Sequence, residues 1–322
     1  MRENARHTVP VGDRRVAGRD YGPRDGRPVL FIAGAASGSS MSFATEHMLH
    51  DAGIRLLTMD RPGMGDSTTD PTRTLASTVR DYRRYVEHVV GAARLPVPVV
   101  ANSQGSVFGL AAALDGWVSR LVLVSPADEV AFPAIRALLP SEAVQLSELA
   151  SSDPRAAERI LAGFDADKME RLVLDGSGPQ DRTAYSSPAF LVMYRRALRE
   201  GFADAGAGYV RDTLLAMQPW DLPLDDVRCR VDVLIGAQDT GHSPDQAATL
   251  TRRIAGARRE LFPDAGGALL WTHAPDVLAH LSRRAPRRRR ESGVQGAART
   301  LGSGGLSRPA DFRSASTAEG EP

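Results

Sequence analysis

The chain has 322 residues, of which 42% are hydrophobic and 25% are charged, and its formal net charge at pH 7 is +1. This composition is typical of a globular protein with one large α/β domain or two small ones. The balanced charge gives no reason to expect a nucleic acid as partner, and the single cysteine, Cys229, excludes an intrachain disulfide framework. Neither a signal peptide nor an apolar run of about 18 residues is recognisable, so we expect a cytoplasmic protein without a membrane span.

Strands and helices are expected to alternate along the chain. Residues 8–21 should form an antiparallel hairpin, and helices should follow over residues 41–52 and 74–94. Short apolar runs predict buried strands over residues 29–33, 54–60, 97–101, 118–125, 231–235 and 260–262. This alternation predicts an α/β fold with a mostly parallel sheet and helices on both faces.

Ser103 lies where an apolar strand is expected to turn into a helix. At such a turn the serine is held in a strained backbone conformation, its hydroxyl is exposed at the edge of the sheet, and its neighbours Ala101 and Gly105 must be small because they come close together. The turn also places Ser103 at a helix N-terminus, where free N–H groups can hold an anion. Ser103 is therefore the candidate nucleophile. The alternative is an ordinary strand-to-helix turn that happens to contain serine.

Two stretches resemble motifs of the α/β-hydrolase superfamily. The segment Ala101–Gly105 resembles the family's Gly-x-Ser-x-Gly motif with alanine in the first position, and Asp60–Ser67 resembles its Asp-Arg-Pro-Gly-x-Gly-x-Ser loop. The resemblance covers residues 14–283 and implies an α/β-hydrolase-like fold. It also implies a serine hydrolase that acts on a small or medium apolar ester, lactone or related acyl compound.

The same resemblance implies two oxyanion donors. In the family, the strand before the oxyanion loop ends in His-Gly, and the next residue donates its backbone N–H. This chain has Ala33-Gly34 there, so Ala35 matches the donor, and Gln104, directly after the nucleophile, matches the second. Residues 34–40 could instead form a flexible loop. A phosphate-binding loop is not expected, because its lysine is missing.

An insertion divides the expected core. Residues 127–225 have a helical pattern with proline and glycine breaks, and in the family an insertion here is a helical cap over the nucleophile. We therefore expect a hydrolase core over residues 8–126 and 227–283 and a cap over residues 127–226. Residues 284–322 are rich in Arg, Gly, Ser and Pro and are expected to form a disordered basic tail.

The family's catalytic acid follows a core strand in a Gly-x-x-Asp pattern, which Asp239 matches. The alternative is an aspartate that caps a turn or a helix, because Ser243-Pro244 is a helix-start signal. The family's general base is absent from its usual place, where relatives have Gly-His and this chain has Gly266-Gly267. Without a base, a serine hydroxyl is a poor nucleophile at neutral pH.

Two other histidines could supply the base. His242 is on the same loop as Asp239 and could fill the space at Gly267, although it lies so near Asp239 that reaching both that carboxylate and Ser103 is demanding. His273, before the final helix, is the second candidate, and a third possibility is that no base exists. The other five are expected in the N-terminal segment or on helices that run away from the carboxyl edge of the sheet: His7, His47, His50, His88 and His280.

Two classes of function follow. One is a hydrolase that uses Ser103, Asp239 and His242, and the other is a hydrolase-like binding protein that has lost turnover. A cofactor-free lyase or oxygenase on the same fold also normally needs the missing histidine. We expect a small-molecule partner, no cofactor, no metal, no nucleic acid and no membrane, while the oligomeric state is left open.

Overall fold

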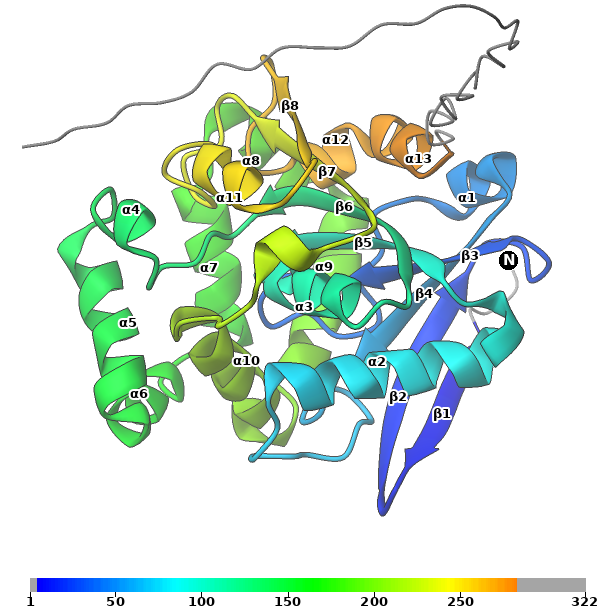
Figure 1. Ribbon diagram of the computed structural model, residues 1–322, viewed down its shortest axis with the longest axis horizontal. Helices are drawn as coiled ribbons and strands as arrows, with labels where there is room; N and C mark the ends of the chain where they lie inside the picture. Colours follow the sequence, from blue (N-terminus) through cyan, green and yellow to red (C-terminus); the bar gives the residue numbers. More distant parts are fainter. Residues whose placement is uncertain (1–4, 283–322) are drawn as a thin grey trace, which may run out of the picture. The chain divides into compact units, whose positions relative to one another are not determined.

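The computed structural model describes residues 5–282, so the expected tail over residues 284–322 lies outside the described residues. Its centre is an eight-stranded sheet in the order β1-β2-β4-β3-β5-β6-β7-β8 (Figure 1). The strands are β1 (Arg6–Val11), β2 (Arg14–Tyr21), β3 (Arg27–Ile32), β4 (Ile54–Asp60), β5 (Val97–Ser103), β6 (Val118–Pro126), β7 (Arg230–Gly236) and β8 (Arg258–Phe262). The first two form an antiparallel hairpin whose second strand is antiparallel to β4, and all other pairs are parallel. The predicted mostly parallel sheet is confirmed.

Side chains alternate between two apolar layers, one on each face of the sheet. Within β3, Leu30 and Ile32 belong to one layer, and Val29 and Phe31 belong to the other. Because both faces are covered, the strands are continuous apolar runs in the sequence. The first layer includes α2 (Leu75–Val90) and α3 (Gly105–Leu114), and the second includes α1 (Glu46–Ala52), α12 (Leu269–Thr272) and α13 (Ala274–Ser282). Figure 1 shows the two groups of helices on opposite sides of the sheet.

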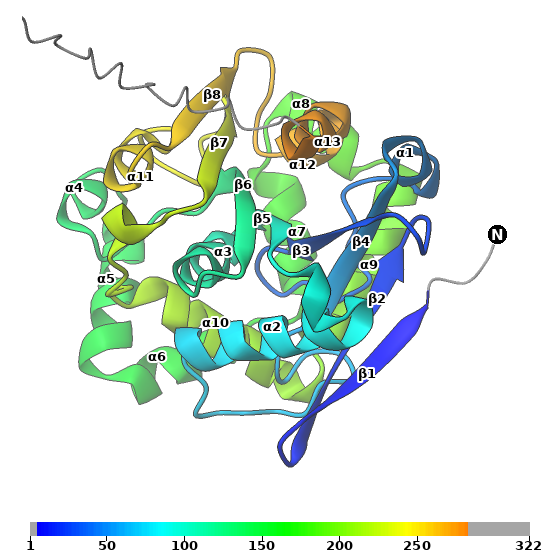
Figure 2. The same cartoon turned by 45° about the vertical axis from the view of Figure 1, so that its right-hand side comes forward.

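Seven α-helices separate β6 from β7, and we call them the helical insertion. They are α4 (Pro133–Arg136), α5 (Ser141–Ser152), α6 (Pro154–Leu161), α7 (Ala166–Gly176), α8 (Pro179–Tyr185), α9 (Pro188–Gly201) and α10 (Ala207–Met217). Figure 2 shows α5, α6 and α10 packed side by side. Within residues 5–282, no helix has both the length and the apolar character needed to cross a membrane.

Two expected helix starts and one expected helix end are wrong, since the helix expected to run to residue 94 ends at Val90. The helix predicted from residue 41 begins only at Glu46, because Thr45 is the N-cap and its side chain accepts a hydrogen bond from the N–H of Met48. The helix predicted at Ser243-Pro244 begins at Ala248, as α11 (Ala248–Arg253). Gln246 and Ala247 have φ values of 55° and 59°, so the chain turns once more before the helix starts.

Candidate active site

Ser103 is the last residue of β5, and α3 begins two residues later. Its φ of 51° places a non-glycine residue in the left-handed region. This conformation is strained and persists only where the surrounding structure enforces it. The backbone at Ser103 therefore agrees with the strained turn expected from the sequence.

Small residues flank this turn for two separate reasons. A Cβ atom at Gly105 would lie 2.5 Å from the carbonyl oxygen of Ile32, and one at Gly109 would lie 2.7 Å from the Cβ of Ala101. The nearest obstacle at position 105 is thus the backbone of β3 and not, as the motif suggests, Ala101. Helix α3 packs directly against β3 and β5, which sets its N-terminus beside the serine.

The two expected donor residues, Ala35 and Gln104, lie next to this turn. Gln104 is the N-cap of α3, and Ala35 lines the same cavity as Ser103. A Cβ at Gly34 would be 3.0 Å from the Cβ of Ser103, so glycine there lets the loop after β3 pass close to the serine. Within residues 5–282, neither the N–H of Ala35 nor that of Gln104 donates a hydrogen bond. Both groups are free to bind a ligand oxygen.

A buried ion cluster, formed by Arg61, Arg73 and Asp212, anchors the loop that carries Ala35. The guanidinium of Arg61 donates to the carbonyl oxygens of Ala33 at 3.0 Å and Gly34 at 2.9 Å. The carboxylate of Asp212, on α10, accepts hydrogen bonds from Arg61 and Arg73. All three side chains are at most 1% exposed. The charge of Asp212 outweighs the effect of burial and raises the pKa of Arg61, so the Arg61 guanidinium stays charged.

Asp239 and His242 form a carboxylate–imidazole pair on the loop after β7. The Nδ1 atom of His242 lies 2.9 Å from one oxygen of Asp239 and 3.0 Å from the other. The N–H groups of Gly241 and His242 also donate to this carboxylate, at 3.1 and 3.2 Å. Because Nδ1 faces the carboxylate, Nε2 is the nitrogen left for another partner.

The two members of this pair shift each other's pKa in opposite directions. Burial alone raises the pKa of Asp239, but the charge and hydrogen bond of His242 outweigh it and bring the pKa below its usual value. Burial alone lowers the pKa of His242, but Asp239, helped by the charge of Asp181, brings the pKa above its usual value. The pair therefore favours a carboxylate next to an imidazole that readily takes up a proton.

Gly267 lies directly against His242. A Cβ atom at Gly267 would be 3.0 Å from Cε1 and 3.2 Å from Nδ1 of the imidazole, and 3.6 Å from an oxygen of Asp239. The imidazole of His242 thus occupies the space that a side chain at position 267 would enter.

A cavity of about 90 Å³ brings Ser103 and His242 together. Its apolar walls come from α7, α8, α9 and α12, through Met169, Val173, Tyr185, Phe190, Tyr194 and Trp271. In the described part of the chain, no hydrogen bond joins the Ser103 hydroxyl to His242. Hydrogen bonds between a nucleophile and its base are often long before substrate binds.

No other described histidine lines this cavity. His273 instead bonds Thr272 through Nδ1 at 2.9 Å, and its ring packs on Phe262 with centroids 5.2 Å apart. His280 is buried on α13, and its Nε2 lies 3.0 Å from a carboxylate oxygen of Glu260. Of the two candidate bases, only His242 lines the cavity of Ser103.

An apolar groove of about 440 Å³ adjoins the cavity. Phe190 and Trp271 line both spaces, and their rings meet edge to face with centroids 5.2 Å apart. On the groove side they are joined by Phe43, Met48 and Met193. From the sequence, Phe190 is only one of many apolar residues of the insertion, so nothing distinguishes it as part of a site.

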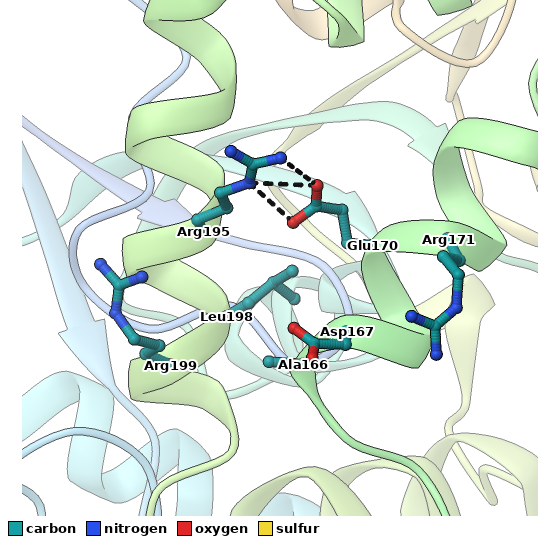
Figure 3. Close-up of a pocket in the computed structure, with 7 residues that line it drawn as sticks. All are labelled: Ala166, Asp167, Glu170, Arg171, Arg195, Leu198 and Arg199. Atoms are coloured by element: carbon teal, nitrogen blue, oxygen red, sulfur yellow. Dashed lines mark hydrogen bonds and ion pairs between the residues drawn. The ribbon is translucent and has the colours of Figure 1, made fainter.

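A second hollow, between α7 and α9, is charged and shares no residue with the cavity (Figure 3). Arg195 and Glu170 form a bidentate ion pair across it, with Nη2–Oε1 and Nε–Oε2 distances of 2.7 and 2.9 Å. Because the Arg195 side chain is 53% exposed, solvent screens this pair, so it contributes little to stability. Among residues 5–282, no group of three or more His, Cys, Asp or Glu side chains could hold a metal ion.

Comparisons with known proteins agree with this architecture. Solved structures with the same fold include a hydrolase from Pseudomonas aeruginosa PA01 (18% identity, 86% of this chain and 96% of that chain, TM-score 0.61) and a thermophilic esterase from Thermogutta terrifontis (19%, 87% and 97%, 0.61). An enol-lactonase from Burkholderia xenovorans LB400 is 18% identical over 86% of this chain and 98% of that chain, with a TM-score of 0.54. At these identities the likeness shows the fold alone. No curated protein matches the sequence.

The sequence itself matches a family model. The model described as "Alpha/beta hydrolase family" covers residues 29–283, which include every candidate site residue. The chain therefore belongs to the alpha/beta hydrolase family.

Proposed function

We propose that the protein is a serine hydrolase of small or medium apolar esters, lactones or related acyl compounds. The observation that carries the proposal is the position of His242, which bonds Asp239 through Nδ1 and lines the cavity of Ser103. In the reaction, the Ser103 oxygen bonds to the acyl carbon while its proton passes to Nε2 of His242. The N–H groups of Ala35 and Gln104 hold the resulting oxyanion.

The acyl-enzyme is then hydrolysed by the same groups. Nε2 of His242 gives its proton to the departing alcohol and next takes one from water, whose oxygen bonds to the acyl carbon. The same proton then passes from Nε2 to the Ser103 oxygen as the acyl–serine bond breaks, which releases the carboxylic acid and restores Ser103. Asp239 keeps the imidazole oriented and stabilises its charged form. The balance of atoms requires only water as co-reactant, so no cofactor is involved.

The apolar groove supports the proposed substrate class. The cavity beside Ser103 is too small for more than a short group, whereas the adjoining groove has about 440 Å³ and apolar walls. The similar structures include an esterase and an enol-lactonase, which are enzymes of this reaction class. An acyl compound with a medium apolar portion fits both spaces.

One observation favours the alternative, a hydrolase-like binding protein. Among the described residues, Ser103 and His242 share a cavity but no hydrogen bond. A protein without turnover would keep the pocket and its ligand while the hydroxyl stayed unactivated. The two functions differ in whether Ser103 becomes covalently modified.

Replacement of the nucleophile separates these functions. We expect Ser103→Ala to lower hydrolysis of p-nitrophenyl acetate, butyrate and octanoate by about 10³-fold or more, because the acyl-enzyme cannot form. A fluorophosphonate probe should modify Ser103 in the natural protein. Ser106→Ala is the matched control, since Ser106 is buried in α3 and does not line the cavity. Modification of another serine, or unchanged hydrolysis in Ser103→Ala, would reject the assignment.

The acid side of the pH profile should report on His242. A general base acts in its neutral form, and the pKa of His242 is raised, so activity should be lost as the pH falls through a value above the ordinary histidine pKa of about 6.5. Measurement of kcat/KM for p-nitrophenyl butyrate from pH 5 to 9 checks this. An acid limb below pH 6 would contradict the raised pKa.

A further inference from the structure

Asp181 is a residue of the helical insertion whose carboxylate is bonded to the core. It lies in the first turn of α8, yet its two oxygens accept hydrogen bonds from the N–H groups of Gly267 at 2.8 Å and Ala268 at 3.0 Å. The residue is only 9% exposed. Ala268 is the N-cap of the short helix α12, and its own side chain makes no capping hydrogen bond. The carboxylate of Asp181 instead accepts hydrogen bonds from the N–H groups at this helix start.

The same turn is in contact with the proposed base. A Cβ at Gly266 would lie 2.3 Å from a carboxylate oxygen of Asp181, and a Cβ at Gly267 would lie 3.0 Å from Cε1 of His242. Two consecutive glycines therefore let the backbone fit between an insertion carboxylate and the imidazole. A shift of Asp181 would move the backbone on which the imidazole rests.

The charged groups around His242 make Asp181 a second source of negative charge. Asp239 is the bonded partner on the same loop, and Asp181 approaches from α8. Tyr185, also on α8, is neutral because burial raises its pKa. Asp128, from the segment after β6, directs its carboxylate to the hydroxyl of Ser243 at 3.0 Å. Among these groups, within the residues that the structure describes, Asp181 is the only carboxylate that belongs to the helical insertion.

We propose that Asp181 is a positioning residue, which holds the Gly266–Ala268 turn against the His242 imidazole and so links the seating of the helical insertion to the geometry of the base. The inference rests on the proposed function for its kinetic meaning. Asp181 does not line the cavity, so it acts through His242 and not on substrate. The charge of Asp181 also favours the protonated imidazole of His242. A residue that only capped α12 would not need to affect His242 in this way.

The charge is tested by titrating His242 directly. Asp181→Asn keeps the size and one acceptor oxygen but removes the charge, and the Hε1 resonance of His242 is assigned by its loss in His242→Asn. We expect the NMR titration midpoint of His242 to fall by at least about 0.3 pH unit in Asp181→Asn. Asp153→Asn is the matched control, because Asp153 caps another insertion helix by accepting from the N–H of Ala156 at 3.0 Å.

The geometry is tested by kinetics. Asp181→Ala loses both hydrogen bonds to the turn, and we expect kcat for p-nitrophenyl butyrate to fall about tenfold with KM little changed, since a small displacement of a base is costly. Gly266→Ala should give a similar loss, because its new Cβ would displace the carboxylate of Asp181. Gly176→Ala, where a Cβ meets nothing within 4 Å, is the control.

The outcomes separate this inference from the proposed function. An inactive natural protein with a shifted His242 midpoint in Asp181→Asn would contradict the hydrolase and support the contact. An active protein in which neither Asp181→Asn moves the midpoint nor Gly266→Ala lowers kcat would overturn the inference. An inactive protein with an unmoved midpoint would overturn both. If Asp181→Ala does not fold, the other two variants provide the measurements.

Discussion

His242→Ala is expected to lower kcat for p-nitrophenyl butyrate at least about a hundredfold, with KM little changed, because the variant has no group that takes the proton of Ser103. The effect should persist from pH 6 to 9. His273→Ala is the control, since His273 bonds Thr272 and does not line the cavity, and it should keep the natural rate.

Moving the imidazole to position 267 provides the complementary test. In the natural background, Gly267→His is expected to lower hydrolysis of p-nitrophenyl butyrate, because the new Cβ would lie 3.0 Å from Cε1 of His242 and displace that ring. In the His242→Ala background the space is empty, and Gly267→His should recover activity at least about tenfold. Unchanged activity in His242→Ala together with a large gain in the single Gly267→His variant would reject His242 as the base.

Asp212→Asn is expected to lower the free energy of unfolding by about 3–5 kcal/mol, because it leaves Arg61 and Arg73 charged and buried without their carboxylate. For a chain of this size the melting temperature should fall by roughly 10 °C. The loop that carries Ala35 should also loosen, since Arg61 holds the carbonyl oxygens of Ala33 and Gly34. Thermal denaturation followed by circular dichroism checks the stability.

The matched control for this variant is Glu170→Gln. It removes one partner of the Arg195–Glu170 pair, which solvent already screens, so the free energy of unfolding should change much less than in Asp212→Asn. Equal melting temperatures for Asp212→Asn and Glu170→Gln would show that burial of the ion cluster does not determine how much the cluster contributes to the free energy of unfolding.

The core of the fold is predictable because buried strands require apolar residues, which are visible in the sequence. The strands around Phe31 and Val100 are covered on both faces, so each is a short apolar run between turns. The strained turn at Ser103 is predictable too, because close packing of α3 on β3 requires glycine at 105. The boundaries of α1 and α11 were not, since they depend on a single side-chain cap and on two residues with positive φ.

The candidate site is predictable only in part. Ser103 and Asp239 follow strands in recognisable patterns. His242 is recognisable as a candidate base because Gly267 has no side chain to fill the usual position. Its closeness to Asp239 is no obstacle, because a tight turn directs both Nδ1 and two backbone N–H groups to one carboxylate.

Asp181 and Arg61 show why the rest could not be predicted. An acidic residue in the first turn of a helix normally faces solvent and stabilises the helix N-terminus, so Asp181 has no sequence signal of a bond to a backbone 86 residues away. Arg61 belongs to a motif, but its partner Asp212 is 151 residues away on α10. Such contacts are set by tertiary packing and have no local pattern.

The spacing of Asp239 and His242 has a consequence for inheritance. When an acid and a base come from distant segments, a recombination event can separate them, and each half is useless alone. In this chain the proposed acid, Asp239, and the proposed base, His242, are three residues apart within the loop after β7. A single short exchange covering residues 236–243 would therefore transfer both side chains of the proposed pair to a related gene, provided that the recipient has glycine where this chain has Gly267.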